Sequence, residues 1–336
     1  MLQFENHTDF AGTIFASPDP DGIDTLFTVI KGTFDIGADL ARAEEQVDIV
    51  MADEHHADVA TSSVSAPSDL SLVKPATDVL LLGHAWTPGG KPGYYADVSL
   101  QAGPLIRQVR AFGDRIWSGL TGSTASTPEP FTRMPLVWER AFGGMDEGRD
   151  GPAADARNPV GSGFRAPHSR IPIDGQRLPN LEDPADPITS PRQTPVPACF
   201  APIAAHWYPR RAFAGTYDEA WQESRAPYLP LDFDPRFFQC AAPGLTAGSW
   251  FQGGELIDIR GATPDGWLQF ALPMLAVHVT YRVSGSDQRR PANLDTVIIE
   301  PDSGRLILVW PAALACDKSL LKVERVTANL ENGSAE

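Results

Sequence analysis

The chain has 336 residues, of which 42% are hydrophobic and 21% charged, an ordinary composition for one large β-rich globular domain or two average domains. Its formal net charge of -16 argues against nucleic acid and anionic membrane surfaces as partners, because like charges repel, and it favours a basic partner. The 31 prolines and 29 glycines favour turns and loops over long helices.

Residues 1–118 are predicted to form an N-terminal β region. Strands are expected at 13–16, 25–34, 78–83, 95–100 and 106–113, where β-branched and aromatic residues cluster. The turn-forming sequences at 18–22 and 88–90 suit hairpins. Within this region only 40–46 has a composition typical of a helix.

Residues 119–243 are predicted to form a loop-rich middle segment with short helices. Proline and glycine are so frequent from 143 to 202 that no long element fits, and scattered apolar residues indicate an ordered loop that packs on the rest of the protein. Thr216 followed by Glu219 fits a capping box, which predicts a helix to about Ser224. Asp234 before Pro235 predicts a second short helix to about residue 241.

Residues 244–328 are predicted to form a C-terminal β region. Strands are expected at 255–260, 275–283, 296–300 and 305–310, with a hairpin turn at 301–304 and a final strand at 318–326. Residues 329–336 are expected to be a flexible tail. Together these elements predict a single mainly β domain over 1–328, in which antiparallel, sandwich-like sheets from the N- and C-terminal thirds support the irregular middle segment.

The cysteines and the apolar stretches indicate a cytoplasmic protein. Cys199, Cys240 and Cys316 are far apart and lack C-x-x-C spacing, which predicts reduced thiols and neither a disulfide framework nor a zinc cluster. The chain start lacks a basic segment followed by an apolar run, so no secretory signal is visible. The longest uncharged apolar stretch, 267–281, is too short to span a bilayer, so we expect no membrane insertion.

Two local patterns resemble ligand sites, and we favour a structural interpretation of both. Residues 53–58 are rich in potential metal ligands, but adjacent His55 and His56 would point to opposite faces of a strand, which favours a solvated turn. Residues 161–166 fit the G-x-G-x-x-A dinucleotide pattern, but Pro167 forbids the helix that must follow, so a turn is predicted. Neither pattern leads us to expect a metal or a cofactor.

Asp232 and Asp234 form an i, i+2 carboxylate pair, and paired carboxylates can serve as the general acid and base of a hydrolase. In the alternative interpretation Asp234 caps a helix and Asp232 holds a loop amide or an arginine. We favour this alternative because a helix start follows directly. The sequence contains no Walker loop, H-E-x-x-H helix or G-x-S-x-G elbow, so the indications of enzymatic activity are weak.

Aromatic residues alternate with charged residues through the middle segment. The aromatic residues are Trp138, Trp207, Tyr217 and Trp221, and the charged residues are Arg140, Arg157, Arg210 and Asp218. Such residues dominate the hot spots of protein interfaces, which suggests a binding surface. They are equally suited to a core in which aromatic rings cover the loops and ion pairs tie the backbone together. The sequence leaves both interpretations open.

The middle segment resembles a bacterial family known as a domain of unknown function and associated with type VI secretion, whose members act as effector adaptors or chaperones. The matching blocks are Trp138-Glu139-Arg140-Ala141-Phe142-Gly143-Gly144, Asn158-Pro159-Val160-Gly161-x-Gly163-Phe164, Leu178-Pro179-Asn180-Leu181-Glu182, Trp207-x-Pro209-Arg210, Gly215-Thr216-Tyr217-Asp218-x-x-Trp221 and Leu229-Pro230-x-Asp232-Phe233-Asp234. The blocks at 113–115 and 253–255 extend the match over nearly the whole chain. Ser162 stands where a basic residue is expected, and Cys199-Phe200 replaces a pair that contains glycine.

The resemblance implies a non-catalytic protein that binds a cognate effector and helps load it onto the VgrG/PAAR spike. It implies no cofactor and no catalytic residue, and it makes a small-molecule ligand unexpected. Two rival functions are a hydrolase that uses Asp232 or Asp234 and a carbohydrate-binding β module. The second rival requires exposed tryptophans on one strand face, whereas the tryptophans of this sequence are expected largely in loops.

Overall fold

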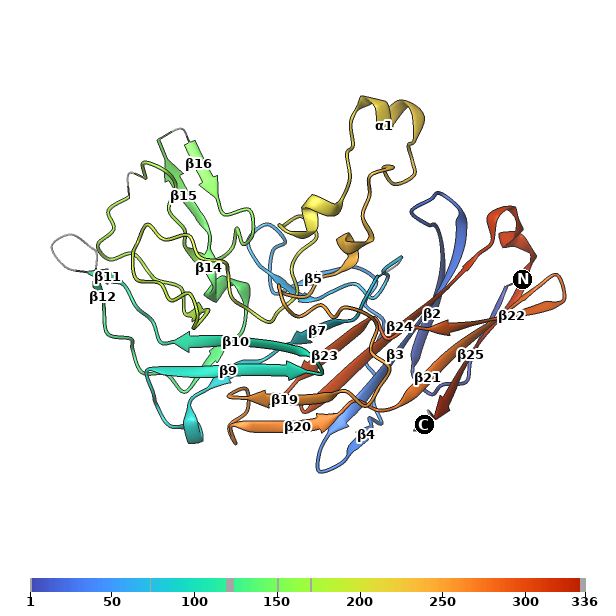
Figure 1. The fold of residues 1–336 in the computed structure, drawn as a ribbon, viewed down its shortest axis with the longest axis horizontal. Coiled ribbons are helices and arrows are strands. Elements are labelled where there is room, and N and C mark those ends of the chain that lie inside the picture. Colours follow the sequence, from blue (N-terminus) through green and yellow to red (C-terminus); the bar gives the residue numbers. More distant parts are fainter. Residues whose placement is uncertain (1, 73, 119–123, 150, 170, 333–336) are drawn as a thin grey trace.

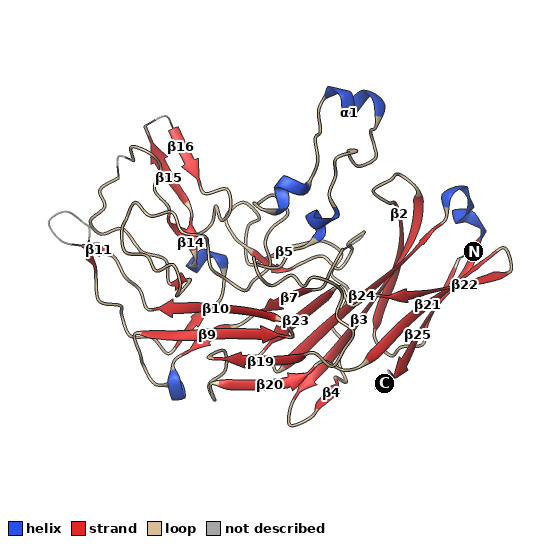
Figure 2. Cartoon of the chain, in the orientation of Figure 1, coloured by secondary structure: helices blue, strands red, loops and turns tan. Residues whose placement is uncertain are grey.

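The predicted mainly β fold is confirmed in a computed structural model, which describes residues 2–72, 74–118, 124–149, 151–169 and 171–332. Most strands belong to three larger sheets, and most of the pairings are antiparallel (Figures 1 and 2). Each of these sheets combines strands from the N- and C-terminal thirds of the chain, as the sequence predicts.

The six-stranded sheet lies at the centre of the fold. Its order is β2 (Ala11–Pro18), β3 (Asp24–Ile36), β24 (Arg305–Ala315), β23 (Thr296–Glu300) and β7 (Asp78–Leu81), with β4 (Leu40–Arg42) paired to the end of β3. All residues of β3 from Thr25 to Phe34 are buried, which explains why most of them are apolar or β-branched. Lys31, in the middle of this run, is neutralised by Asp69 at 2.8 Å.

The four-stranded sheet packs against one end of the six-stranded sheet. Its order is β1 (Gln3–Asn6), β25 (Val323–Asn332), β21 (Leu275–Val283) and β22 (Ser286–Ala292). A separate apolar cluster joins the two sheets and includes Leu26 and Leu314 from one and Val326 from the other. Tyr281 of β21, fully buried, forms a 3.0 Å hydrogen bond with the Thr28 hydroxyl of β3. This contact gives the sandwich-like arrangement.

The five-stranded sheet has one buried face and one exposed face. Its order is β18 (Leu181–Glu182), β10 (Leu105–Phe112), β9 (Tyr95–Ala102), β19 (Leu256–Arg260) and β20 (Trp267–Ala271). Val98, Leu100, Ile257 and Ile259 alternate with polar residues and are at most 1% exposed. This period-two pattern is what a sheet with one solvated face requires.

Short strand pairs and short helices make up the remaining regular structure of the described residues. The pairs are β5 (Glu54–His55) with β6 (Val64–Ala66), β8 (His84–Trp86) with β13 (Arg133–Pro135), β11 (Trp117–Ser118) with β12 (Thr124–Ala125), β14 (Phe142–Gly143) with β17 (Ser162–Gly163), and β15 (Met145–Gly148) with β16 (Gly151–Ala154). The α-helix is α1 (Glu219–Ser224), and the 3-10 helices are η1 (Pro88–Gly90), η2 (Trp138–Arg140), η3 (Arg210–Phe213), η4 (Pro235–Phe238) and η5 (Asp317–Lys322).

Residues 40–46 do not form the helix that their composition suggests. Leu40–Arg42 is strand β4, and Gln46 bonds the β3 backbone at Thr33, accepting from its amide at 2.8 Å and donating to its carbonyl at 3.1 Å. These contacts with β3 outweigh the weak helix propensity of so short a segment.

The C-terminal end also differs from the sequence prediction. The strand expected at 318–326 begins as the helix η5 and becomes β25 only at Val323. Strand β25 continues to Asn332 in antiparallel register with β21. The prediction of a flexible tail from residue 329 is therefore wrong for residues 329–332. Residues 333–336 lie outside the described residues.

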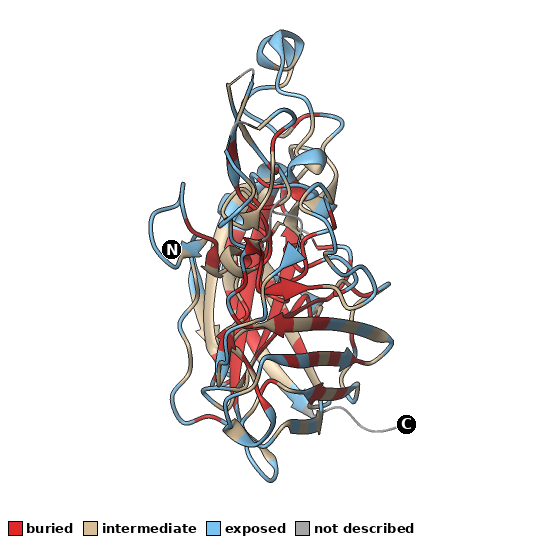
Figure 3. Cartoon of the chain, turned by 90° about the vertical axis from the view of Figure 1, so that its left-hand side faces the viewer, coloured by how far each residue is buried: buried red, intermediate tan, exposed pale blue. Residues whose placement is uncertain are grey.

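Buried residues gather around the sheets, whereas the segment that carries α1 projects from the rest of the molecule (Figures 1 and 3). Strand β20 lies in the lower part of the molecule in Figure 1, near β4 and on the side opposite α1.

Candidate protein-binding site

Two of the four aromatic residues predicted for the site, Trp138 and Trp207, are in the core. Trp138 and Trp207 are 2% and 1% exposed, and their rings meet edge to face with centroids 6.4 Å apart. The Trp138 indole N–H donates to the carbonyl oxygen of Pro202 at 2.9 Å. Arg210 is also buried and donates to the carbonyl oxygens of Ile203 and Phe237 at 2.6 and 2.9 Å. For the two blocks that contain these three residues the core interpretation applies.

Asn158 holds the block that begins at Trp138. Its side-chain amide is fully buried and donates to the carbonyl oxygens of Trp138 and Phe142 at 2.8 and 2.9 Å. Gly144 has a φ of 103°, and a Cβ placed there would lie 2.4 Å from the carbonyl oxygen of Gly161. Glycine is therefore required where the two loop segments meet.

Charged residues of the same blocks connect distant parts of the chain. Both carboxylate oxygens of Glu139 accept from Ser63, one from its amide at 2.7 Å and one from its hydroxyl at 2.8 Å. Arg140 donates to the Asn180 side chain at 3.1 Å and lies 3.4 Å from Asp114. Of the other predicted residues, Phe142, Gly143, Gly144, Pro179 and Asn180 are buried, and Pro159 and Gly161 are half-buried.

Residues 214–233 are different, because they project from the protein and expose large apolar side chains; we call this segment the aromatic arm (Figure 1). Tyr217 is 54% exposed, Tyr228 40% and Leu231 87%. Trp221 is half-buried and packs edge to face against Tyr217 with centroids 4.7 Å apart. The arm is therefore where the structure places candidate interface residues.

The base of the arm is closed by Asp232 and Thr216. Asp232 accepts from the Thr216 amide at 2.9 Å and from the Thr216 hydroxyl at 2.7 Å. Gly215 has a φ of 79°, and a Cβ there would lie 2.9 Å from Pro230, so the two chains of the arm approach too closely for a side chain. The capping box predicted at Thr216 is wrong, because its hydroxyl bonds Asp232 instead.

Asp218 is the actual cap of α1 and accepts from the Trp221 amide at 2.9 Å. Toward the tip of the arm, the Trp221 indole N–H donates to the carbonyl oxygen of Tyr228 at 2.8 Å. Arg225 donates to the carbonyl oxygens of Leu229 at 2.8 Å and Pro20 at 2.9 Å, which ties the arm to the β2–β3 turn. These bonds hold the exposed rings in one arrangement.

The Asp232 and Asp234 carboxylates have the structural partners that the sequence favoured. Asp234 caps η4 through the Arg236 amide at 2.9 Å and also pairs with the Arg236 guanidinium. The hydrogen bonds from Thr216 lower the pKa of Asp232, and the side chain of Arg236 lowers the pKa of Asp234. A general acid needs a raised pKa, so this geometry does not favour acid–base catalysis at the pair.

The two ligand-like patterns lie in a small hairpin and around a short strand, and the turn predicted at 161–166 is not found. Strands β5 and β6 form a small hairpin in which His55 Nδ1 lies 3.0 Å from the Ser62 carbonyl oxygen and Asp53 accepts from the Ser68 amide at 2.8 Å. Among the described residues no group of three or more His, Cys, Asp or Glu side chains is placed to hold a metal ion. Residues 161–166 contain the two-residue strand β17 and no helix, so the dinucleotide pattern lacks its structural context.

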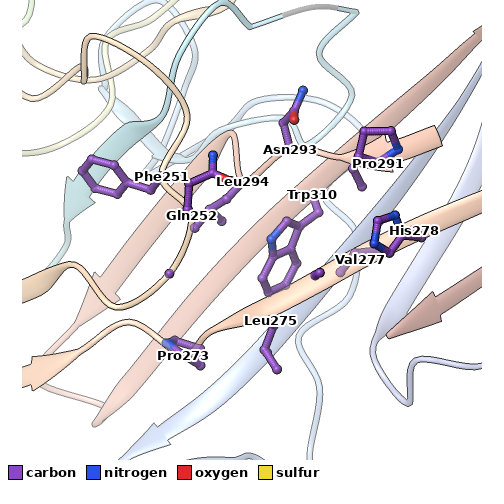
Figure 4. A pocket seen from close by; sticks show the side chains of 13 residues that line it. Phe251, Gln252, Pro273, Leu275, Val277, His278, Pro291, Asn293, Leu294 and Trp310 are labelled. Atoms are coloured by element: carbon purple, nitrogen blue, oxygen red, sulfur yellow. The ribbon is translucent and has the colours of Figure 1, made fainter. Parts of the chain in front are cut away.

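The described cavities differ in size, from about 180 Å³ to about 470 Å³. One of about 180 Å³ lies beside Trp310 and is lined mostly by apolar residues, and His278 is the single titratable residue in its lining (Figure 4). A second, of about 340 Å³, is lined by His56, Ser65 and His84, and His84 Nδ1 lies 2.6 Å from Asp302. In the described structure the Ser65 hydroxyl forms no hydrogen bond with either imidazole, so no activated nucleophile is assembled there.

The three cysteines are buried and unpaired. Burial raises the pKa of Cys199 and of Cys240 to about 12, which makes both poor nucleophiles.

No helix among the described residues has the length and apolar character needed to cross a membrane. The tryptophans are not largely in loops, as was expected, because four of them lie in strands: Trp86 in β8, Trp117 in β11, Trp267 in β20 and Trp310 in β24. Of these four, Trp267 is 55% exposed and lies on the outer face of β20.

Comparison with known proteins gives one match. No curated protein and no solved structure matches the chain. A family profile described as an uncharacterized protein conserved in bacteria (DUF2169) matches residues 21–311, which include the core blocks, the aromatic arm and strands of all three larger sheets. The chain therefore belongs to this uncharacterized family conserved in bacteria.

Proposed function

We propose that the protein is a non-catalytic adaptor that binds a partner protein through the aromatic arm. The observation that carries this proposal is the exposure of Tyr217, Tyr228 and Leu231 on a segment whose backbone is fixed by internal hydrogen bonds. Tyrosine and tryptophan are enriched in binding hot spots because each buries a large area with few rotatable bonds.

Pre-organisation of the arm favours binding. A flexible loop loses conformational entropy when it docks, and this loss subtracts from the affinity. The Asp232–Thr216 bonds at the base and the Trp221–Tyr228 bond toward the tip impose the order before the partner arrives. The arm therefore presents exposed aromatic rings on a rigid base, as a docking element requires.

The charge of the arm favours one kind of partner. The arm carries four acidic residues, Asp218, Glu219, Glu223 and Asp232, against one basic residue, Arg225, whose guanidinium is engaged in backbone contacts. The β2–β3 turn that Arg225 contacts adds Asp19 and Asp21. A partner with a basic surface is therefore favoured, and its association will slow as salt rises.

The resemblance to type VI secretion adaptors suggests that this partner is a secreted effector. In this proposal the arm holds a cognate secreted effector in the cytoplasm, and the adaptor then helps to load the effector onto the VgrG/PAAR spike. Binding energy alone performs the task, without a chemical step.

Co-expression with the effector encoded beside the gene tests the proposal. The wild-type protein is expected to co-purify with the effector, and the Tyr217→Ala/Leu231→Ala variant is expected to retain at least about tenfold less of it, since two exposed anchors are removed. Leu321→Ala is a matched control, because Leu321 is 99% exposed on η5 and lies outside the arm.

Two results would count against this function. Absence of both co-purification and any change in effector abundance would remove the adaptor role. Equal retention by the wild-type protein and the arm variant would remove the arm as the docking surface.

A further inference from the structure

Strand β20 presents an unpaired edge. It is the last strand of the five-stranded sheet and, in the part of the chain that the structure describes, pairs only with β19 (Figures 1 and 2). An open edge exposes a row of backbone donors and acceptors that can pair with another chain.

The hydrogen-bond register identifies which groups face outward. The Gly261 amide donates to the Gly266 carbonyl oxygen at 3.0 Å, so by the two-residue alternation of antiparallel pairs Leu268 and Phe270 bond β19. The Leu272 amide, which donates to the Glu255 carbonyl oxygen at 2.9 Å, fits the same alternation. The backbone groups of residues 267, 269 and 271 therefore point away from β19.

The buried face of the sheet is incomplete at this edge. Ile257 and Ile259 of β19 are 0% and 1% exposed, whereas Leu268 and Phe270 of β20 belong to the same core but are only half-buried. An additional strand with apolar side chains on this face would cover both residues. The free energy gained would come from apolar burial as well as from backbone hydrogen bonds.

The edge lacks the features with which proteins discourage strand addition. Strand β20 carries no charged residue and no proline. By contrast, the edge strand β22 carries Arg289, Arg290 and Pro291, and the outer side of β7 is covered, since the Val79 amide donates to the Leu245 carbonyl oxygen at 2.9 Å. The edge strand β2 is in contact with β1 at Gly12 and ends at Pro18.

We propose that β20 receives an extended strand from a second partner protein, the one to which the client is delivered. This inference rests on the proposed adaptor function, because an adaptor needs two separate surfaces. The aromatic arm and β20 lie on opposite sides of the molecule (Figure 1). One partner can therefore occupy each surface without displacing the other.

Charge and pattern define the incoming strand. Its side chains alternate, with apolar residues facing Leu268 and Phe270 and polar or basic residues on the outer face. Basic residues are favoured there because the protein carries a net charge of -16. Asp258 on that face already accepts from Arg260, Trp267 and Gln269, so the overall charge and not this carboxylate supports the preference. A second copy of this chain is disfavoured, since two strongly acidic chains repel each other.

Gln269→Pro tests this proposal. Proline removes the outward amide at 269, and it leaves the bonds to β19 made by Leu268 and Phe270 in place, because proline is tolerated at an edge where the N–H faces solvent. Gln269→Ala is the matched control, since it removes the same side chain and keeps the amide. The probes are the purified VgrG or PAAR protein and the effector encoded beside the gene.

The expected result is at least about tenfold weaker retention of the spike protein by Gln269→Pro, with wild-type retention by Gln269→Ala and unchanged effector binding by both. Residue-resolved hydrogen exchange of the wild-type protein should show slower exchange at the amides of 267, 269 and 271 when the spike protein is added. This second readout does not depend on the folding of the proline variant.

Three results would overturn the proposal, and they differ from one another. Equal spike binding by both variants, with no added amide protection, would exclude the edge and leave the adaptor function standing. A wild-type dimer that becomes a monomer in Gln269→Pro would assign the edge to a second copy of the chain. A wild-type protein that binds neither probe would remove the adaptor function and this inference with it.

Discussion

The ammonium group of Lys74 lies 3.3 Å from the carboxylate of Asp78, and both side chains are almost completely buried. Asp78 also accepts from the Cys240 amide at 2.7 Å and from the Thr246 hydroxyl at 2.8 Å. Burial alone lowers the pKa of Lys74, but attraction to Asp295 and to the other buried acceptors raises it above its ordinary value. Lys74 therefore remains charged inside the protein, and the contacts of the pair join residues 74–78 to residues 240–246 and to Asp295.

Replacement of Lys74 by methionine should lower the free energy of unfolding by about 3–5 kcal/mol, because it leaves buried carboxylates without their cation. Urea unfolding of the variant and the wild-type protein measures this difference. Lys318→Met is the control, since Lys318 is exposed and its replacement should change stability by less than about 0.5 kcal/mol. Equal effects of the two substitutions would show that the buried pair does not stabilise the fold.

Replacement of Asp295 by asparagine should change how stability depends on pH. Burial raises the pKa of Asp295, although Lys74 and the hydroxyls of Thr296 and Ser71 stabilise its charged form. Because the folded pKa lies above the unfolded value near 3.8, the stabilisation from this group is complete below pH 3.8 and is lost as pH rises through the folded pKa. The wild-type protein should therefore lose stability relative to Asp295→Asn as the pH rises above about 4 in urea unfolding. If the free energy of unfolding depended on pH in the same way for both proteins, the raised pKa of Asp295 would be contradicted.

Much of the sheet structure follows from the sequence, because burial imposes a readable pattern. The alternation of Val98 and Leu100 with polar residues marks β9, and the hairpin turn at 301–304 joins β23 to β24. The apolar stretch 267–281 does not reveal that it contains two strands of different sheets. The choice of partner strand depends on contacts far apart in the chain, which local patterns do not record.

The candidate site is less predictable than the sheets. Trp138 and Trp221 occur in similar aromatic blocks, yet one is a core residue and the other lies on the arm. Thr216 and Glu219 have capping-box spacing, but Asp232, sixteen residues away from Thr216, competes for the threonine hydroxyl. One sequence feature indicates that the arm is solvated: it contains four acidic residues and a single arginine. The β20 edge has no local sequence signal, because it is an edge only through the topology of the sheet.

Alanine at Gly144 should destabilise the protein much more than alanine at Gly175. Both glycines have positive φ, 103° and 80°, so both substitutions carry a backbone cost of about 1–2 kcal/mol. A Cβ at Gly144 would also overlap the Gly161 carbonyl oxygen, whereas a Cβ at Gly175 has no described atom within 4 Å. The total for Gly144→Ala should exceed about 3 kcal/mol in urea unfolding. A difference near zero would mean that the loops meet less closely than the structure indicates.

Replacement of Trp221 by phenylalanine should loosen the aromatic arm without unfolding the protein. The variant loses the indole N–H that donates to the Tyr228 carbonyl oxygen at 2.8 Å and keeps a ring beside Tyr217. Loss of one such bond, about 1 kcal/mol, should raise tryptic cleavage after Arg225 roughly fivefold while the urea midpoint changes little. Trp267→Phe is the matched control, because its indole also donates one hydrogen bond, to Asp258 at 2.9 Å, but it lies in β20 and should leave cleavage at Arg225 unchanged. Equal cleavage rates in all three proteins would show that the Trp221 bond does not order the arm, and arm rigidity would then have to come from the Asp232–Thr216 contact at its base.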